Sequence, residues 1–517
     1  MIQFFQMQQE TIIKELQNEN QFLKLELDRI KEVVRLLKRD LFGSKSERIT
    51  EISPDQLVFN EIEKEAATLE PFEKSSEENT EEVETITYDR KKGRGKKKPF
   101  PENLVREEKI IDLDEKDKFC PHDGTPLKEI GEERTEKFKT IPAQMSVLVE
   151  IKKKYACPCC ESFLAQPKSN SVLPGTIATP ELISFLVFSK FFQGLPLYRL
   201  EELFKLNGVS LTRGTMARWL IQVSEKLMPI YNLLQEKVFD TGYMAIDATN
   251  VQVLKEHGKS AKSKSFMWVR GSPERGIVLF DYDPYGGGAV ARKLTTEFKG
   301  ALQADAHRGY AALDKSELTL LGCMMHSRRR FHEAFLGGNK KRGIASEALA
   351  IFKWLYEREE HYKKTALTPE ARKEIRDREI GPSLDTMKEW AIEKSKLVPK
   401  TSKIGNALHY FINEFSELTA FLKNGRFEID NGWVERTIRK FAIGRNNWLF
   451  CDTVEGAQAS SLLYSLTITA KLNGKDPFKT LTEILQKLPD ATIVDDYEAL
   501  TELLLSPYNP DSIQKKN

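Results

Sequence analysis

The stretch "YMAIDATNVQVL" at residues 243–254 decides the fold of this chain. It is rich in apolar and β-branched side chains, which indicates a buried strand. "SFMWVRGS" (265–272) and "GIVLFDYD" (276–283) follow at short intervals, and this spacing predicts an antiparallel meander of three strands. Asp247 interrupts the first strand. Because a charge within a strand is costly unless it is paired or bound to a metal, Asp247 is the first candidate functional residue.

The segments that follow the meander predict the rest of the sheet. A helical stretch at 289–299 leads to "ALQADAHRGY" (301–310) and then, after another helix, to "LTLLGCMMHSRRRF" (318–331). Three antiparallel strands, a helix, a fourth strand, a helix and a fifth strand is the order of a ribonuclease-H-like domain, a mixed sheet with helices on both faces. Asp305 ends the fourth strand, which neighbours the first in this order. We therefore expect Asp305 and Asp247 to meet at one edge of the sheet.

A third carboxylate comes from "FEIDNGWVERTIRKF" at 427–441, which predicts a helix crossing that edge. Its apolar stripe is Val434, Ile438 and Phe441. Glu435 sits beside this stripe and faces the rim. The alternative is a plain salt pair between Glu435 and Arg439, four positions on, worth a few tenths of a kcal/mol.

Three carboxylates are hard oxygen ligands, which suit Mg²⁺ or Mn²⁺ better than zinc. Two such ions ~3.5–4 Å apart stabilise the attacking and leaving oxygens in phosphoryl transfer. We therefore predict that Asp247, Asp305 and Glu435 are catalytic and hold two divalent ions.

Basic side chains near these carboxylates are predicted to contact nucleic acid phosphates. His326, placed at the end of the fifth strand, either positions phosphate or serves as a hydrogen-bonded structural histidine. In "GRNNWLF" (444–450), Trp448 is equally compatible with a core position. The predicted DNA-binding residues of this region are His326, Arg329, Arg436, Arg439, Arg445 and Asn447.

Residues 1–42 carry a heptad repeat that predicts a coiled coil. Its apolar seam, with one asparagine, is Ile13, Leu16, Asn20, Leu23, Leu27, Ile30, Val34, Leu37 and Leu41. Asn20 occupies an a position, where a buried amide fixes a two-stranded register. The repeat therefore predicts self-association, and a long surface helix packed on its own protein is the alternative.

Residues 43–104 read as a flexible linker with two blocks of opposite charge. An acidic run at 73–84 precedes the basic arm "RKKGRGKKK" at 90–98. Such an arm can lie along phosphates without reading sequence, although the acidic run can also neutralise it. The predicted phosphate contacts are Arg94, Lys96, Lys97 and Lys98.

Residues 105–172 form a small cysteine-containing module. "YACPCCES" supplies a C-x-x-C pair, the spacing that zinc thiolate sites favour, whereas "CPHDG" supplies no second pair. The candidate ligands are Cys120, His122, Asp123, Cys157 and Cys160. The module holds one Zn²⁺ if His122 or, less readily, Asp123 completes the site; otherwise it is a metal-free version of the same fold.

Residues 173–238 predict a helix-turn-helix. An amphipathic helix breaks at Asn207 and Gly208, and Thr212 is placed to cap a second helix. Arg213 and Arg218 lie at the start and middle of that second helix, where they can reach DNA. An ordinary helical hairpin is the alternative.

The composition of the whole chain sets limits on its class. At 517 residues the chain is expected to hold several domains. Its 79 basic and 77 acidic residues nearly cancel, so net charge indicates no partner. No stretch approaches the ~18 consecutive apolar residues of a membrane span. We expect no membrane partner and a cytoplasmic protein.

Several blocks resemble the transposases of the insertion-sequence sixty-six family of bacterial mobile elements. They are "LFGSKSER" (41–48), "CPHDG" with "YACPCCES", "LPLYRLEELFKLNGVSLTRGTMARWL" (195–220), "DATNVQVL" (247–254), "GCMMHSRRRF" (322–331), "NGWVERTIRKFAIGRNNWLF" (431–450) and "TAKLNGKDP" (469–477). The similarity runs from about residue 41 to 490. Asp123 departs from it, because many members place a second cysteine of the zinc module there.

The resemblance implies that Asp247, Asp305 and Glu435 are the D-D-E metal ligands. It also implies a catalytic domain at 239–450 with a helical insertion at 335–425, followed by a C-terminal helical region at 451–517. The expected partners are double-stranded DNA (terminal inverted repeats and target), a homodimer or higher oligomer, and accessory proteins of the same element. The resemblance also implies association with the bacterial nucleoid when the protein is active. A cellular ribonuclease-H-like nuclease or resolvase, and a DNA-binding regulator without catalysis, are the alternatives.

Overall fold

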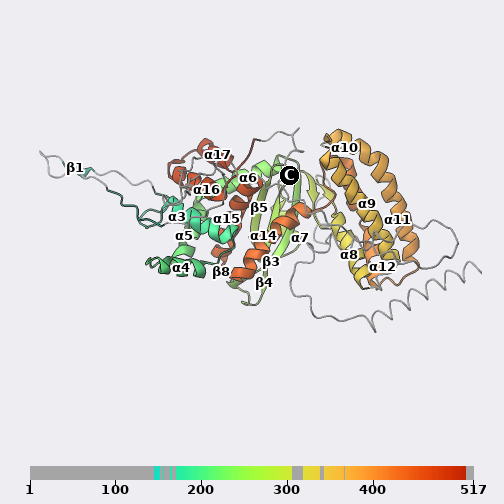
Figure 1. Ribbon diagram of the computed structural model, residues 1–517, viewed down its shortest axis with the longest axis horizontal. Coiled ribbons are helices and arrows are strands. Elements are labelled where there is room, and N and C mark those ends of the chain that lie inside the picture. Colours follow the sequence, from blue (N-terminus) through green and yellow to red (C-terminus); the bar gives the residue numbers. More distant parts are fainter. Residues whose placement is uncertain are drawn as a thin grey trace, which may run out of the picture. The chain divides into compact units, whose positions relative to one another are not determined.

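The computed structural model describes residues 145–151, 155–156, 164–165, 171–305, 318–337, 343–365 and 367–507 (Figure 1). The predicted coiled coil, the basic arm and all five candidate zinc ligands lie outside the described residues. Within the cysteine-containing module, β1 (Tyr155–Ala156) and β2 (Leu164–Ala165) pair as a small antiparallel sheet. The chain divides into two compact units, and residues 171–507 belong to one of them.

The centre of this unit is a sheet with the predicted three-strand meander. Its strands are β3 (Tyr243–Lys255), β4 (Lys264–Ser272), β5 (Ile277–Asp283), β6 (Gly300–Gln303), β7 (Leu318–Leu321) and β8 (Cys451–Thr453). The strand order is β5-β4-β3-β6-β7, and β8 pairs with the end of β3. The meander is antiparallel, whereas β6 runs parallel to β3 and β7 parallel to β6. The fourth strand therefore neighbours the first, as the sequence predicted.

The free edge of this sheet, strand β5, is covered by the buried helix α15 (Val454–Leu472). The Ser465 hydroxyl accepts the N–H of Phe280 at 2.8 Å, and Thr469 Oγ1 accepts the N–H of Val278 at 3.1 Å. Thr469 Oγ1 also donates to the carbonyl of Val278 at 3.2 Å. Side chains of a helix thus satisfy backbone groups that a further strand would otherwise pair, which protects the edge.

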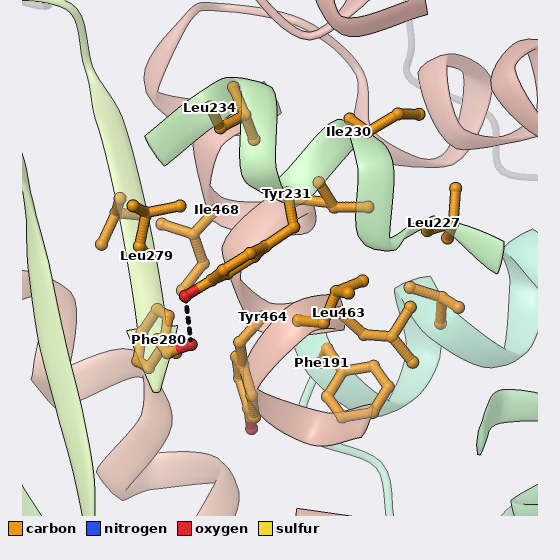
Figure 2. Close-up of a cluster of buried hydrophobic side chains, with 14 of the residues drawn as sticks. Phe191, Leu227, Ile230, Tyr231, Leu234, Leu279, Phe280, Leu463, Tyr464 and Ile468 are labelled. Atoms are coloured by element: carbon orange, nitrogen blue, oxygen red, sulfur yellow. Dashed lines mark hydrogen bonds between the residues drawn. The ribbon is translucent and has the colours of Figure 1, made fainter. Parts of the chain in front are cut away.

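Helix α6 (Met228–Phe239) packs against the same strand through a buried cluster (Figure 2). Figure 2 shows Tyr231 of α6 beside Phe280 of β5 and Tyr464 of α15. The Tyr231 hydroxyl donates its single proton mainly to Asp281 Oδ1 at 2.7 Å and shares it with the carbonyl of Phe280 at 3.2 Å. The hydroxyl is therefore satisfied although the ring is buried, which is the condition for placing tyrosine in a core.

The predicted pair of helices before the sheet is present as α4 (Leu197–Leu206) and α5 (Arg213–Lys226). Thr212 caps α5, since its side chain accepts the N–H of Thr215 at 3.3 Å. This confirms the predicted N-cap. Arg213 and Arg218 are exposed on α5. Two further segments, α3 (Pro180–Val187) and the π-helical η2 (Phe188–Phe192), precede this pair.

A second hydrophobic core lies among the helices between β7 and residue 429. These helices are α8 (Met324–Leu336), α9 (Ile344–Lys364), α10 (Pro369–Ile375), η4 (Arg376–Ile380), α11 (Gly381–Ser395), α12 (Lys403–Asn413), α13 (Phe415–Thr419) and η5 (Ala420–Lys423). The chain then returns to the sheet through α14 (Gly432–Trp448). After α15 it continues as α16 (Pro477–Lys487) and α17 (Val494–Leu503). No helix in the described residues is long and apolar enough to cross a membrane.

The expected position of His326 at the end of the fifth strand is wrong. The strand ends at Leu321, and His326 lies in the first turn of α8. Gly322 ends the ladder, because its N–H donates to the carbonyl of Glu417 at 2.7 Å. The apolar residues that suggested a strand are one face of a helix: Met324 and Phe331, seven positions apart, are both fully buried. The helix predicted at 289–299 is shorter, as α7 (Gly288–Leu294).

Candidate active site

Asp247 and Asp305 lie near each other at the junction of β3 and β6. The register of these parallel strands pairs Ala245 with Gln303. Asp247 lies two residues further along β3, and Asp305 lies two residues beyond the end of β6. The two carboxylates are close enough for the charge of Asp305 to affect the pKa of Asp247.

Asp247 is held as a poorly solvated carboxylate. Burial raises the pKa of Asp247 to about 6. The hydrogen bond that Oδ1 accepts from the N–H of Ala248 at 2.7 Å acts in the opposite direction and lowers this pKa. The negative charge of Asp305 raises this pKa further, and Arg329 opposes it. A bound cation would supply the countercharge that the pair lacks, so these residues fit a divalent ion.

Glu435 enters this region from the first turn of α14. The start of that helix is fixed to β3, because Asn431 Nδ2 donates to the carbonyl of Ile246 at 2.9 Å. Arg329 Nη2 lies 3.2 Å from Glu435 Oε2, so the carboxylate is paired in this structure. Its side chain is 14% exposed. The pair with Arg329 therefore holds Glu435 toward α8, and the bond of Asn431 keeps the start of its helix beside β3.

His326 lies between Asp305 and Glu435. Its Nε2 is 3.6 Å from Asp305 Oδ2, and its Nδ1 is 3.6 Å from Glu435 Oε1. Burial lowers the pKa of His326, with Asp305 opposing and Arg329 and Arg330 adding to the effect. Burial therefore favours the neutral form of the imidazole. Asp247 and Asp305 therefore lie close together, and His326 lies between Asp305 and Glu435.

The tightest group of potential metal ligands has a different membership. Among the described residues, ligand atoms of Cys323, His326 and Glu435 all lie within 4.8 Å of one another. The three carboxylates do not form so close a group within the same residues. Glu435 is the member that both sets share.

Two predicted DNA-binding residues make contacts within the protein. Arg445 Nη1 donates to Thr249 Oγ1 at 3.1 Å and to the carbonyl of Asn250, which fixes α14 along β3. Asn447 Nδ2 donates to the carbonyl of Gly194 at 3.0 Å. Their contact with DNA stays a prediction.

The remaining predicted residues of this region are on α8 and α14. Arg436 is exposed and Arg439 half-buried on α14, and Arg329, which pairs with Glu435, is half-buried on α8. Trp448 packs edge-on against Phe441 with ring centroids 5.6 Å apart, which favours the core reading of this tryptophan.

Sequence reasoning missed two residues at this site. The hydroxyl of Tyr410 in α12 donates to Asp305 Oδ1 at 3.3 Å. The guanidinium of Arg330 lies over the Tyr410 ring, 4.1 Å from the ring centroid. No sequence pattern connects Tyr410 to Asp305, 105 positions away. Cys323 was detectable, because it precedes His326 by three positions, the distance that brings two side chains together at the start of a helix.

Comparison with known families gives matches along most of the chain. A family model described as "Transposase IS66 family" matches residues 175–459, more than half of the chain, and this range includes all three carboxylates. Residues 117–161 match the "zinc-finger binding domain of transposase IS66". Residues 29–108 match a model described as "Transposase C of IS166 homeodomain".

Relatives from Sinorhizobium fredii are similar over nearly their whole length. The uncharacterized protein y4hP is 27% identical over 498 residues, which cover 90% of this chain and 87% of that protein. The uncharacterized protein y4qI is 28% identical over 503 residues, covering 93% and 89% respectively. The uncharacterized protein y4jD is 26% identical over 507 residues, covering 94% and 96%.

Proposed function

Because the chain belongs to the IS66 family of transposases, we propose that it binds the terminal inverted repeats of an insertion sequence and catalyses metal-dependent DNA cleavage and strand transfer. The observation that supports this proposal is the proximity of Asp247 and Asp305, with the start of the helix that carries Glu435 bonded to Ile246, the residue before Asp247. The strand order supports a ribonuclease-H-like catalytic core at 239–450, with the helices of 335–425 as its insertion.

Asp247, Asp305 and Glu435 would hold two divalent ions, Mg²⁺ or Mn²⁺, which would stabilise the attacking and leaving oxygens of the phosphoryl transfer. Water and then a freed 3′-hydroxyl act as the nucleophiles. Arg329, which pairs with Glu435 in this structure, would pair with a DNA phosphate once Glu435 binds an ion. His326, which lies between two of the carboxylates, would orient them.

The regions outside the catalytic core supply DNA contacts and assembly in this proposal. The coiled coil at 1–42 makes a homodimer or larger assembly, and the arm within 43–104 contacts phosphates. The module at 105–172 would hold one Zn²⁺, with His122 or, less readily, Asp123 as the fourth ligand. Arg213 and Arg218 of the 173–238 region contact the inverted repeats, and accessory proteins of the same element join the complex.

The test is cleavage of a duplex that carries the element's terminal repeats by the full-length protein in Mg²⁺. Asp247→Asn, Asp305→Asn and Glu435→Gln each remove one negative charge with little change of shape. We expect each to abolish cleavage and to leave binding of the repeats, measured by gel shift, nearly intact. Asp452→Asn is the matched control, since Asp452 of β8 is exposed and pairs with Lys255 of β3.

Two results would count against the proposal. Cleavage by the carboxylate variants at the rate of the control would show that these side chains hold no catalytic ion. Cleavage that is equal on duplexes with and without the repeats would indicate a general nuclease instead.

A further inference from the structure

Cys323, His326 and Glu435 converge where two helices begin. Cys323 is the N-cap residue of α8, and His326 lies in the first turn of that helix. Glu435 lies in the first turn of α14. Their ligand atoms lie within 4.8 Å of one another, so small movements of the side chains bring them to the spacing of ligands around one ion.

The chemistry of this group differs from that of the three carboxylates. A thiol, an imidazole and a carboxylate offer sulfur, nitrogen and oxygen, the mixed donors that zinc takes at three-ligand sites with an open fourth position. Magnesium takes oxygen ligands and does not select sulfur. This donor set therefore distinguishes zinc-like ions from Mg²⁺.

The orientation of His326 matches that of a metal ligand. Its Nδ1 faces Glu435 Oε1 at 3.6 Å, is buried, and makes no hydrogen bond within the described structure. Its Nε2 faces the carboxylate of Asp305 at 3.6 Å. Histidines that ligate metal usually present the opposite nitrogen to a carboxylate, which fixes the ring.

The sulfur and the carboxylate are also oriented. The N–H of Asn431 donates to Cys323 Sγ at 3.2 Å, the kind of contact that holds a metal-bound thiolate in place. Arg329 pairs with the Oε2 atom of Glu435. Glu435 can therefore bind an ion through Oε1 and keep its partner arginine.

We propose that Cys323, His326 and Glu435 form a second metal site, which takes Zn²⁺ and competes with the catalytic ions for Glu435. Binding releases the thiol proton of Cys323 to solvent and forms one bond from each side chain to zinc. With Glu435 engaged, Asp247 and Asp305 are left without their third partner. The inhibitory consequence rests on the proposed function, whereas the metal site itself does not.

Cobalt(II) tests the site directly, because a thiolate bound to Co²⁺ gives a charge-transfer absorption band in the near ultraviolet. The full-length protein is compared with Cys323→Ser and Cys451→Ser. Cys451 is the matched control, a second buried free cysteine that lies outside the group. Cysteines of the zinc-finger-like module contribute equally to all three spectra.

We expect Cys323→Ser to lose one bound Co²⁺ per chain with its share of the band, and Cys451→Ser to lose neither. His326→Gln keeps the thiol but removes the nitrogen, and we expect it to bind this Co²⁺ about tenfold more weakly or worse. Thermal unfolding shows whether each variant folds. Cobalt binding by folded Cys323→Ser or His326→Gln equal to that of the unsubstituted protein overturns the proposal.

Zinc titrated into the Mg²⁺-dependent cleavage reaction tests the competition. We expect Cys323→Ser to need about tenfold more Zn²⁺ for half-inhibition than either the unsubstituted protein or Cys451→Ser. Equal inhibition of all three would overturn the competition. If none of them cleaves DNA in Mg²⁺, the proposed function fails, and the cobalt spectra still decide whether the metal site exists.

Discussion

At the scale of single residues, Asn431 fixes the distance between two of the candidate ligands. Its side chain donates to the carbonyl of Ile246, the residue before Asp247, and its backbone N–H donates to Cys323 Sγ. Glu435 follows one helical turn later, and its N–H donates to the carbonyl of Asn431. Asn431 is 1% exposed, so water cannot replace these contacts.

Asn431→Ala removes the donor to Ile246 and frees the start of α14. We expect the free energy of unfolding to fall by about 1–3 kcal/mol. We expect Mg²⁺-dependent cleavage to fall further, about 10²-fold, because small displacements of catalytic groups have large effects on rate. Denaturant unfolding and the cleavage assay measure the two effects. Asn446→Ala, at an exposed position of the same helix, should change neither, and equal losses in both variants would contradict this role.

The carboxylates could be proposed from sequence because their residue type conflicts with their surroundings. Asp247 stands in an apolar strand, and strand order alone places Asp305 beside it. Tyr410 could not be found in this way, since a tyrosine in an amphipathic helix is ordinary and only the tertiary fold brings it to Asp305. His326 was correctly predicted to lie near the carboxylates, but it was assigned to the end of a strand and lies in a helix. A short apolar run does not distinguish a strand from a helix.

At the scale of elements, α15 stabilises the edge strand β5 through side chains. Thr469→Val keeps the shape of the residue but leaves the N–H and carbonyl of Val278 without this partner. We expect it to lower the free energy of unfolding by about 1–3 kcal/mol. Thr467→Val is the matched control on the same helix. Thr467 is equally buried, and its hydroxyl bonds only the carbonyl of Leu463 within α15.

Denaturant titration of the two valine variants measures the difference. A cost for Thr467→Val as large as that for Thr469→Val would show that the contact with β5 adds nothing. The helical character of residues 451–517 was predicted from the resemblance alone, and α15 and α16 lie in this region. The hydrogen bonds from α15 to β5 could not be predicted, because nothing in the sequence indicates which distant strand a helical serine or threonine contacts.

At the scale of the molecule, a buried ion network joins the helices of the second core to the sheet. Glu359, 2% exposed, accepts from Arg372 Nη2 at 2.6 Å and from Arg376 Nε at 2.7 Å. Glu428 extends the network, with Lys363 Nζ 2.5 Å from its Oε2. Its backbone N–H donates to the Tyr243 hydroxyl at 3.1 Å and thereby reaches β3. Glu428, four positions before α14, therefore contacts both β3 and a helix of the second core.

This network predicts how the protein responds to acid. Burial works against the charge of Glu428, but Lys363 and then Arg372 outweigh it and lower its pKa to about 2. An unfolded glutamate has a pKa of about 4.3, so the ionised group stabilises the fold fully above that pH. This contribution, on the order of 2 kcal/mol for a partly exposed group, is lost as the pH falls toward about 2.

Glu428→Gln should therefore be less stable than the unsubstituted protein at pH 7, because Lys363 loses its counterion and Arg372 keeps only Glu359. The difference should shrink as the pH falls from about 4.5 toward 2, where the native glutamate also becomes neutral. Thermal unfolding followed by circular dichroism across this range measures it. Glu360→Gln is the matched control, since Glu360 forms an exposed pair with Lys364 that should add little stability. A difference for Glu428→Gln that stays constant with pH would show that this carboxylate does not link folding to protonation.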